Sequence, residues 1–141
     1  MSTATKTAQV SVTYVAGEEY VVALRDHLVP TDQPQLDGGA DVGPSPVELL
    51  VGSMAACTAF YAGRYLDRHG IPRTVLAVTA EYRTGADPQQ RVTDVRLDVA
   101  VPAGLSQHRK TALLAVLQHC TVHNTLRRAP EIIIGLDEVE S

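Results

Sequence analysis

The chain has 141 residues, of which 45% are hydrophobic and 20% charged, so its length and composition exclude a disordered chain. They predict one globular domain over residues 1–141, with residues 1–8 as a flexible tail. The 12 Lys and Arg against 16 Asp and Glu give a net charge of -4 without a basic stripe, which argues against nucleic-acid binding.

The N-terminal residues lack the apolar segment of a signal peptide, and we expect every apolar stretch to be too short to span a bilayer. We therefore expect a cytoplasmic protein that has no membrane partner. Because disulfides that only hold a fold together are rare in reducing compartments, Cys57 and Cys120 become candidates for redox chemistry.

The first third of the chain predicts a β-hairpin followed by a long loop. Residues 9–24 alternate apolar and polar side chains around a turn at Ala16-Gly17-Glu18, which is typical of two short strands. Residues 30–46 hold four prolines and three glycines, so we expect an irregular loop there, with room for a short edge strand.

A long helix should follow from Ser45 to His69. Ser45 and Glu48 have the spacing of a capping box, Pro46 suits the first helical position, and Gly70 suits the C-terminal end. The N-terminal two-thirds of this helix carry no charge except Glu48, so the helix needs cover on several sides.

The rest of the chain predicts an α+β pattern. We expect strands over 74–84 and 91–101, a helix from Ser106 to Leu117, a short helical turn over 122–128, and a final strand over 131–136.

Each cysteine allows a structural and a chemical interpretation. Cys57 lies in mid-helix on an apolar stripe, where a free cysteine is commonly a small buried hydrophobe. Cys120 lies at a break between two helices beside His119 and His123, where a helix N-terminus and imidazoles favour a thiolate, although a helix-terminal core position is equally compatible. The same residues could be counted as zinc ligands, but they lack paired ligand spacing, so we expect neither a metal nor a cofactor.

Three segments together resemble one known family. They are residues 43–50 (GPSPVELL), residues 54–59 (MAACTA) and residues 120–126 (CTVHNTL), and they are similar to the OsmC/Ohr family of osmotically inducible and organic hydroperoxide resistance proteins. The first segment is more similar to the YhfA-like branch of that family than to its peroxidases.

This resemblance implies an OsmC-like fold, in which antiparallel sheets wrap a long central helix in an intertwined homodimer. It also implies a thiol-dependent peroxidase: Cys57 attacks an organic, lipid-type hydroperoxide, Cys120 resolves the sulfenic acid as a disulfide, and a dithiol such as a lipoyl group reduces the disulfide.

The family also uses an Arg that stabilises the thiolate and a Glu that holds this Arg. Arg25 is the matching Arg by its position before the proline-rich loop. The family's Glu position is occupied by Val47, and Glu48 follows one residue later, so Glu48 is either the displaced catalytic Glu or only the capping partner of Ser45.

Two other functions stay open from the sequence. The first is a non-catalytic protein of the same fold that binds an apolar ligand at the dimer interface. The second is a redox sensor whose two cysteines form a disulfide without steady-state turnover.

Overall fold

The computed structural model describes residues 5–141, so the part of the predicted tail that falls on residues 1–4 lies outside the described residues. The chain divides into two compact units, one ending at Val51 and the other running from Gly52 to Ser141. The expectation of a single domain stays a prediction.

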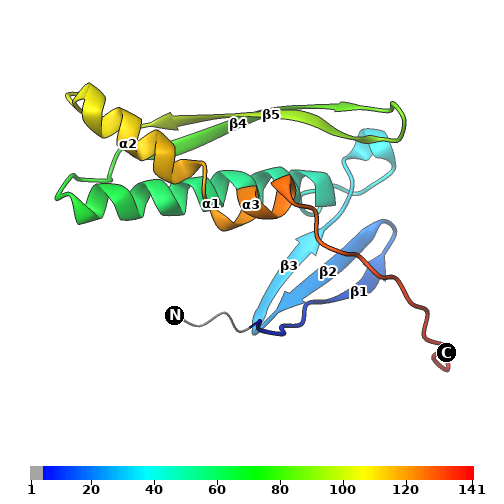
Figure 1. The fold of residues 1–141 in the computed structure, drawn as a ribbon. Coiled ribbons are helices and arrows are strands. Elements are labelled where there is room, and N and C mark those ends of the chain that lie inside the picture. The colour runs from blue at the N-terminus through cyan, green and yellow to red at the C-terminus, as the bar shows by residue number, and fades with distance from the viewer. Residues whose placement is uncertain (1–4) are drawn as a thin grey trace. The chain divides into compact units, whose positions relative to one another are not determined.

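The N-terminal unit contains a three-stranded antiparallel sheet in the order β1-β2-β3 (Figure 1). Its strands are β1 (Ser11–Ala16), β2 (Glu19–Leu24) and β3 (His27–Thr31). The predicted hairpin is confirmed, and β3 adds an edge strand that begins before the predicted loop. Pro30 is tolerated in β3 because an edge strand leaves one row of backbone groups unpaired.

The proline-rich loop is held closed by one buried carboxylate. Asp32 is 1% exposed, and it accepts backbone hydrogen bonds from Gln33 (2.7 Å), Ala40 (3.3 Å) and Val42 (3.2 Å). Gly39 has to be a glycine here, because a Cβ at this position would overlap the Gln33 carbonyl. A short 3-10 helix, η1 (Gln35–Asp37), lies within the loop. The expectation of an irregular loop is therefore confirmed.

The long helix α1 spans Pro46–Arg68, as predicted. The capping box forms: the Ser45 N–H donates to Glu48 Oε1 at 2.8 Å, and the Glu48 N–H donates to Ser45 Oγ at 3.2 Å. At the other end Gly70 has a φ of 68°, and the Ile71 N–H donates to the Leu66 carbonyl, which closes the helix.

By length and composition alone, α1 could cross a bilayer, so the expectation that every apolar stretch is too short is wrong. The core helix of a soluble protein has the same length and composition, so this is weak evidence for a membrane span. Ala62, Tyr65 and Leu66 of α1 are buried in the core of the C-terminal unit.

The C-terminal unit joins the rest of α1 to a β-hairpin and two helices (Figure 1). These elements are β4 (Ala77–Gly85), β5 (Arg91–Ala100), α2 (Gln107–Leu117) and α3 (Thr121–Arg127). Its core is mainly aliphatic, with Tyr65 as a buried ring: Leu113 and Leu117 of α2 pack with the buried residues of α1, and Val99 of β5 packs against them.

Two predicted strands differ from the structure. The strand expected from Thr74 begins only at Ala77, because the Leu76 N–H donates to the Arg73 carbonyl and closes a turn. The expected strand over 131–136 is wrong: residues 129–141 form no helix or strand. Three consecutive isoleucines from Ile132 favour β-structure, but a strand also needs a partner strand.

We expect Asp32→Asn to destabilise the N-terminal unit at neutral pH, because an amide presents its own N–H groups to some of the three backbone donors. The hydrogen bond from the Gln33 N–H is the main cause that lowers the pKa of Asp32 below its usual 3.8. A lowered folded-state pKa stabilises the fold above the unfolded pKa, and this stabilisation is lost as the pH falls through the folded value.

The stability deficit of Asp32→Asn should therefore be largest near pH 7 and shrink below about pH 3.8. Urea denaturation of both proteins between pH 7 and pH 3 measures it. A deficit that stays constant over this range would show that the charge of Asp32 does not hold the loop.

Candidate functional site

The two cysteines lie beside one another in the C-terminal unit. Cys57 is in α1 and half-buried, whereas Cys120 is the N-cap residue of α3 and only 1% exposed. Both are free thiols, and they are close enough for Cys57 to contribute to the pKa of Cys120. The structure thus brings together two residues that are 63 positions apart in the sequence.

Cys120 is placed by the way in which α2 ends. Leu117 is buried at the last position of α2, and the His119 N–H donates to the Val116 carbonyl in a final turn. Cys120 then adopts an extended conformation, with φ -69° and ψ 153°, and its sulfur accepts a hydrogen bond from the His123 N–H at 3.4 Å. The thiol occupies the position in which Ser or Asp commonly caps a helix.

Burial decides the ionisation of Cys120. It raises the pKa of this thiol above 9.0, and the neighbouring Cys57 raises it further. The backbone N–H groups of His123 and Val122 oppose this shift, as expected at a helix N-terminus, but they do not outweigh it. Of the two interpretations that the sequence left open for Cys120, the structure therefore favours the helix-terminal core position, and its raised pKa favours the neutral thiol at pH 7.

A hydrogen bond links the two helices that carry the cysteines. The Tyr61 hydroxyl lies 3.0 Å from Thr121 Oγ1. Tyr61 is one turn beyond Cys57 on α1, and Thr121 directly follows Cys120. This bond therefore fixes the N-terminus of α3 against α1 next to both thiols.

A small cavity of about 250 Å³ opens beside Cys120. Its wall is mainly apolar, with two basic side chains from α3. The lining residues are Met54, Thr58, Val95, Leu97, Cys120, His123, Leu126 and Arg127. Cys57 is not among them, although Met54 and Thr58 flank it on α1. An apolar molecule in this cavity would be in contact with Cys120.

The other two predicted site residues lie in the N-terminal unit. Arg25 is exposed in the turn between β2 and β3 and has a φ of 54°. Glu48 is exposed at the start of α1, where its carboxylate is bound by Ser45; the hydrogen bond from the Ser45 N–H is the main cause that lowers the pKa of Glu48. The structure assigns Glu48 a capping role, and the catalytic roles of Arg25 and Glu48 stay predictions.

Sequence reasoning missed several residues of this site. Arg127 could have been found, because it follows His123 by four positions on α3 and so lies on the same helix face. Val95 and Leu97 could not, since which strand residues reach a cavity depends on how β5 packs. Among residues 5–141, no group of three or more His, Cys, Asp or Glu side chains is arranged to hold a metal ion.

Comparison with known proteins gives the family and the fold. Residues 38–135 match a family model described as OsmC-like protein. No curated protein matches the chain. An OsmC-like protein from Mycoplasma pneumoniae superposes with a TM-score of 0.74 at 16% identity, covering 88% of this chain and 89% of that one.

Two similar structures are described by a role in peroxide resistance. One is an organic hydroperoxide resistance protein OsmC from Legionella pneumophila, with a TM-score of 0.66, 21% identity, and coverage of 88% of this chain and 93% of that one. The other is an organic hydroperoxide resistance protein from Elizabethkingia anophelis, with thiocyanate bound, a TM-score of 0.66 and 20% identity; 88% of this chain and 91% of that one are covered.

These structures confirm the predicted α+β fold of antiparallel strands and a long helix. The match to the OsmC-like family model covers residues 38–135, which is more than half of the sequence. The chain therefore belongs to the OsmC family.

Proposed function

We propose that this protein is a thiol-dependent peroxidase that reduces organic hydroperoxides through Cys57 and Cys120 in defence against oxidative stress. The observation that carries the proposal is the pairing of a half-buried thiol with a fully buried one whose pKa is raised. Relatives described as organic hydroperoxide resistance proteins support the same chemistry.

The different environments of the thiols assign their roles. Cys120 is neutral at pH 7 and almost inaccessible, so it is a poor nucleophile toward a peroxide in solution. Cys57 is the more exposed of the two residues and is therefore assigned as the attacking residue. Cys120 neighbours Cys57 closely enough for Cys57 to raise its pKa, which supports its role as the residue that resolves the oxidised sulfur.

The reaction balances in three steps. The Cys57 thiolate attacks the terminal oxygen of ROOH, the O–O bond breaks, and the alkoxide takes a proton to leave as ROH, with Cys57 as sulfenic acid. The Cys120 sulfur then attacks the Cys57 sulfur, and the hydroxyl leaves with the Cys120 proton as water. A dithiol such as a lipoyl group reduces the disulfide by exchange and is itself oxidised to a cyclic disulfide.

The cavity beside Cys120 suits the organic part of such a peroxide. Met54, Val95, Leu97 and Leu126 give it an apolar wall, which favours an alkyl or aryl hydroperoxide over hydrogen peroxide. The wall belongs to the same unit as both thiols, so it needs no contribution from the N-terminal unit.

We also propose that the protein is an intertwined homodimer in the cytoplasm. Each unit leaves apolar side chains in water: Tyr14 is 63% exposed and Leu28 70% in the sheet, and Ile133 is 83% exposed near the C-terminus. Exposed apolar surface of this kind is typical of protein interfaces. Size-exclusion chromatography with light scattering tests the oligomeric state.

The peroxidase proposal predicts distinct outcomes for the two cysteine variants. With cumene hydroperoxide and dihydrolipoamide, Cys57→Ser should lower turnover by more than about 100-fold, because the attacking sulfur is gone. Without the dithiol, Cys120→Ser should still consume about one equivalent of peroxide and stop with Cys57 as sulfenic acid, and a second equivalent would convert Cys57 to sulfinic acid. Coupled turnover assays and intact-protein mass spectrometry measure both results.

Unchanged turnover in Cys57→Ser would contradict the proposal. If the wild type forms the Cys57–Cys120 disulfide but shows no steady-state turnover, the protein is a redox sensor instead. Absence of any Cys57 oxidation would favour a binding protein with an inert thiol.

We expect Tyr61→Phe to slow disulfide formation without slowing the first attack on the peroxide. Loss of the hydrogen bond to Thr121 frees the N-terminus of α3, which carries Cys120. One hydrogen bond of this kind changes the population of the closed arrangement by about three- to tenfold. The readout is the fraction of Cys57 that becomes sulfinic acid at excess peroxide, which should rise.

Tyr65→Phe is the matched control, because Tyr65 is one turn further along α1 and its hydroxyl donates to the Arg109 carbonyl, away from the cysteines. Equal sulfinic fractions in the two variants would show that the Tyr61–Thr121 bond does not position Cys120.

Glu48→Gln separates the capping role from a catalytic one. Glutamine can still cap α1, so if Glu48 is only a cap, the rate of Cys57 oxidation should change less than about twofold. The lowered pKa of Glu48 means that its charge stabilises the helix above its ordinary pKa of 4.5, and this contribution is lost as the pH falls through the folded value. The stability difference from wild type should therefore be present at pH 7 and vanish in acid.

Stopped-flow oxidation and urea denaturation measure the two effects on the same samples. A large fall in the oxidation rate with unchanged stability would assign Glu48 to catalysis.

A further inference from the structure

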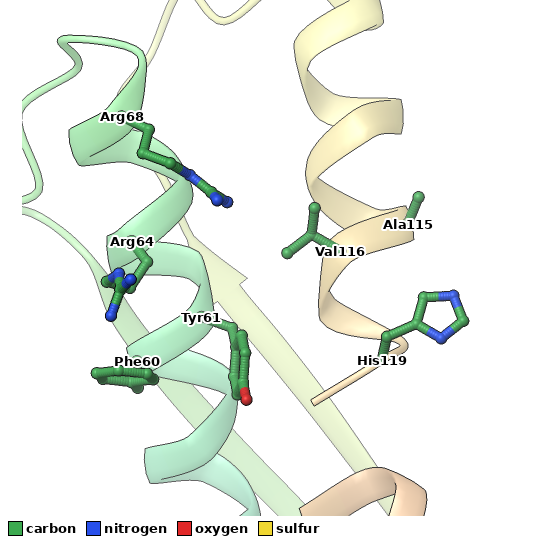
Figure 2. Close-up of a pocket in the computed structure, with 7 residues that line it drawn as sticks. All are labelled: Phe60, Tyr61, Arg64, Arg68, Ala115, Val116 and His119. Carbon is green, nitrogen blue, oxygen red and sulfur yellow. The ribbon is translucent and has the colours of Figure 1, made fainter. Parts of the chain in front are cut away.

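A second and larger cavity lies between α1 and α2 in the C-terminal unit, and neither cysteine lines it (Figure 2). Its volume is about 640 Å³, within the range of about 300–1,000 Å³ that small-molecule sites occupy. The peroxidase chemistry proposed above uses none of its lining residues except Tyr61, whose hydroxyl is bonded to Thr121.

The side chains of this cavity that can be charged at neutral pH are two arginines and one histidine, so the charge they can carry is positive. Arg64 and Arg68 come from α1, and His119 from the end of α2; no acidic side chain lines the cavity. Among residues 5–141, no ion pair joins either arginine to a carboxylate. This is a local excess of positive charge on a chain whose net charge is -4.

The two arginines lie one turn apart on the same helix, a spacing at which two like charges are unfavourable. Figure 2 shows Arg68 extending from α1 toward α2. An anion placed between the arginines would relieve the repulsion and accept charge-assisted hydrogen bonds, for which guanidinium groups are well suited.

The remaining wall is apolar and partly aromatic. Phe60, the one phenylalanine in the chain, is 56% exposed, and the Arg64 guanidinium lies 5.5 Å from the centre of its ring. Tyr61 of α1 and Val116 of α2 line the cavity from its two sides (Figure 2). An exposed aromatic ring beside unpaired cations fits a ligand that has both an apolar body and a negative group.

We propose that this cavity binds an organic monoanion with an apolar body, of the medium-chain carboxylate class. The carboxylate binds Arg64 and Arg68, and the hydrocarbon chain lies along Phe60, Tyr61 and Val116. Both parts of the ligand are required: the cations select its charge, and the aromatic and aliphatic wall selects its chain. The proposal is independent of any peroxidase activity.

Decanoate is the probe for the test, with calorimetric titration as the measurement. A ligand of this size should bind with a Kd on the order of 0.1–1 mM. Acetate, which lacks the chain, and decyltrimethylammonium, which has the opposite charge, should bind at least tenfold more weakly. Added salt should weaken decanoate binding, because the contact is partly electrostatic.

The double variant Arg64→Gln/Arg68→Gln should weaken decanoate binding at least tenfold. The double variant Arg91→Gln/Arg128→Gln is its matched control, since it removes the same charge from exposed positions outside the cavity and should bind like wild type. Phe60→Ala should weaken decanoate several-fold. All variants change exposed side chains, and thermal melts confirm that they remain folded.

Amide chemical-shift changes on decanoate addition should be centred on the residues that line this cavity. Equal decanoate affinity in the two arginine double variants would overturn the proposal, as would equal binding of decyltrimethylammonium. If the wild-type protein forms a dimer in which the second copy covers this surface, and decanoate does not bind, the proposal would be overturned as well. None of these outcomes depends on Cys57, so they are separate from failure of the peroxidase proposal.

Discussion

The aliphatic contact between α1 and α2 is the interaction on which the site depends. Ala62 and Leu66 of α1 are fully buried, and they pack with Leu113 and Leu117 of α2. Burial of a leucine side chain stabilises a fold by about 1.5–3 kcal/mol, so this contact is strong for its size. Because Leu117 is the last residue of α2, anchoring it also fixes where the chain turns, and Cys120 follows three residues later.

The placement of Cys120 combines two opposing effects on one sulfur atom. The N-terminus of α3 supplies backbone donors that favour a thiolate, while burial disfavours any charge. Burial is the larger effect, so the sulfur caps the helix as a neutral group. In the proposed reaction, a neutral and buried thiol is a weak competitor for peroxide, yet it lies beside Cys57, the residue that the peroxide would oxidise.

The sequence predicted the helix starts and the hairpins, because helix caps and turns depend on residues that are close together in the chain. The capping box at Ser45 and Glu48 located the start of α1, and Ser106 located the start of α2. The hairpins followed from alternating side chains and turn residues. The two cysteines were identified as a pair, but not the protonation of Cys120, because burial is a property of the packed fold.

The cavities could not be predicted from sequence, because they depend on how elements pack. His123 and Arg127 share a helix face that a helical wheel reveals, yet nothing in the sequence says that this face meets β5. The same holds for the cavity between α1 and α2: Arg64 and Arg68 look like ordinary solvated charges until α2 places Val116 opposite them.

The residues after α3 show that a local sequence pattern can also predict an element that does not form. The pattern from Ile132 to Ile134 is that of a strand, yet these residues are 77–86% exposed and form no strand. A strand requires both a partner for its backbone and cover for its side chains, and this segment has neither within its own unit. Pairing with a strand edge would satisfy both needs in one step, and a second copy of the chain would supply such an edge. The exposed segment thus supports the proposed homodimer on physical grounds that are separate from the family resemblance.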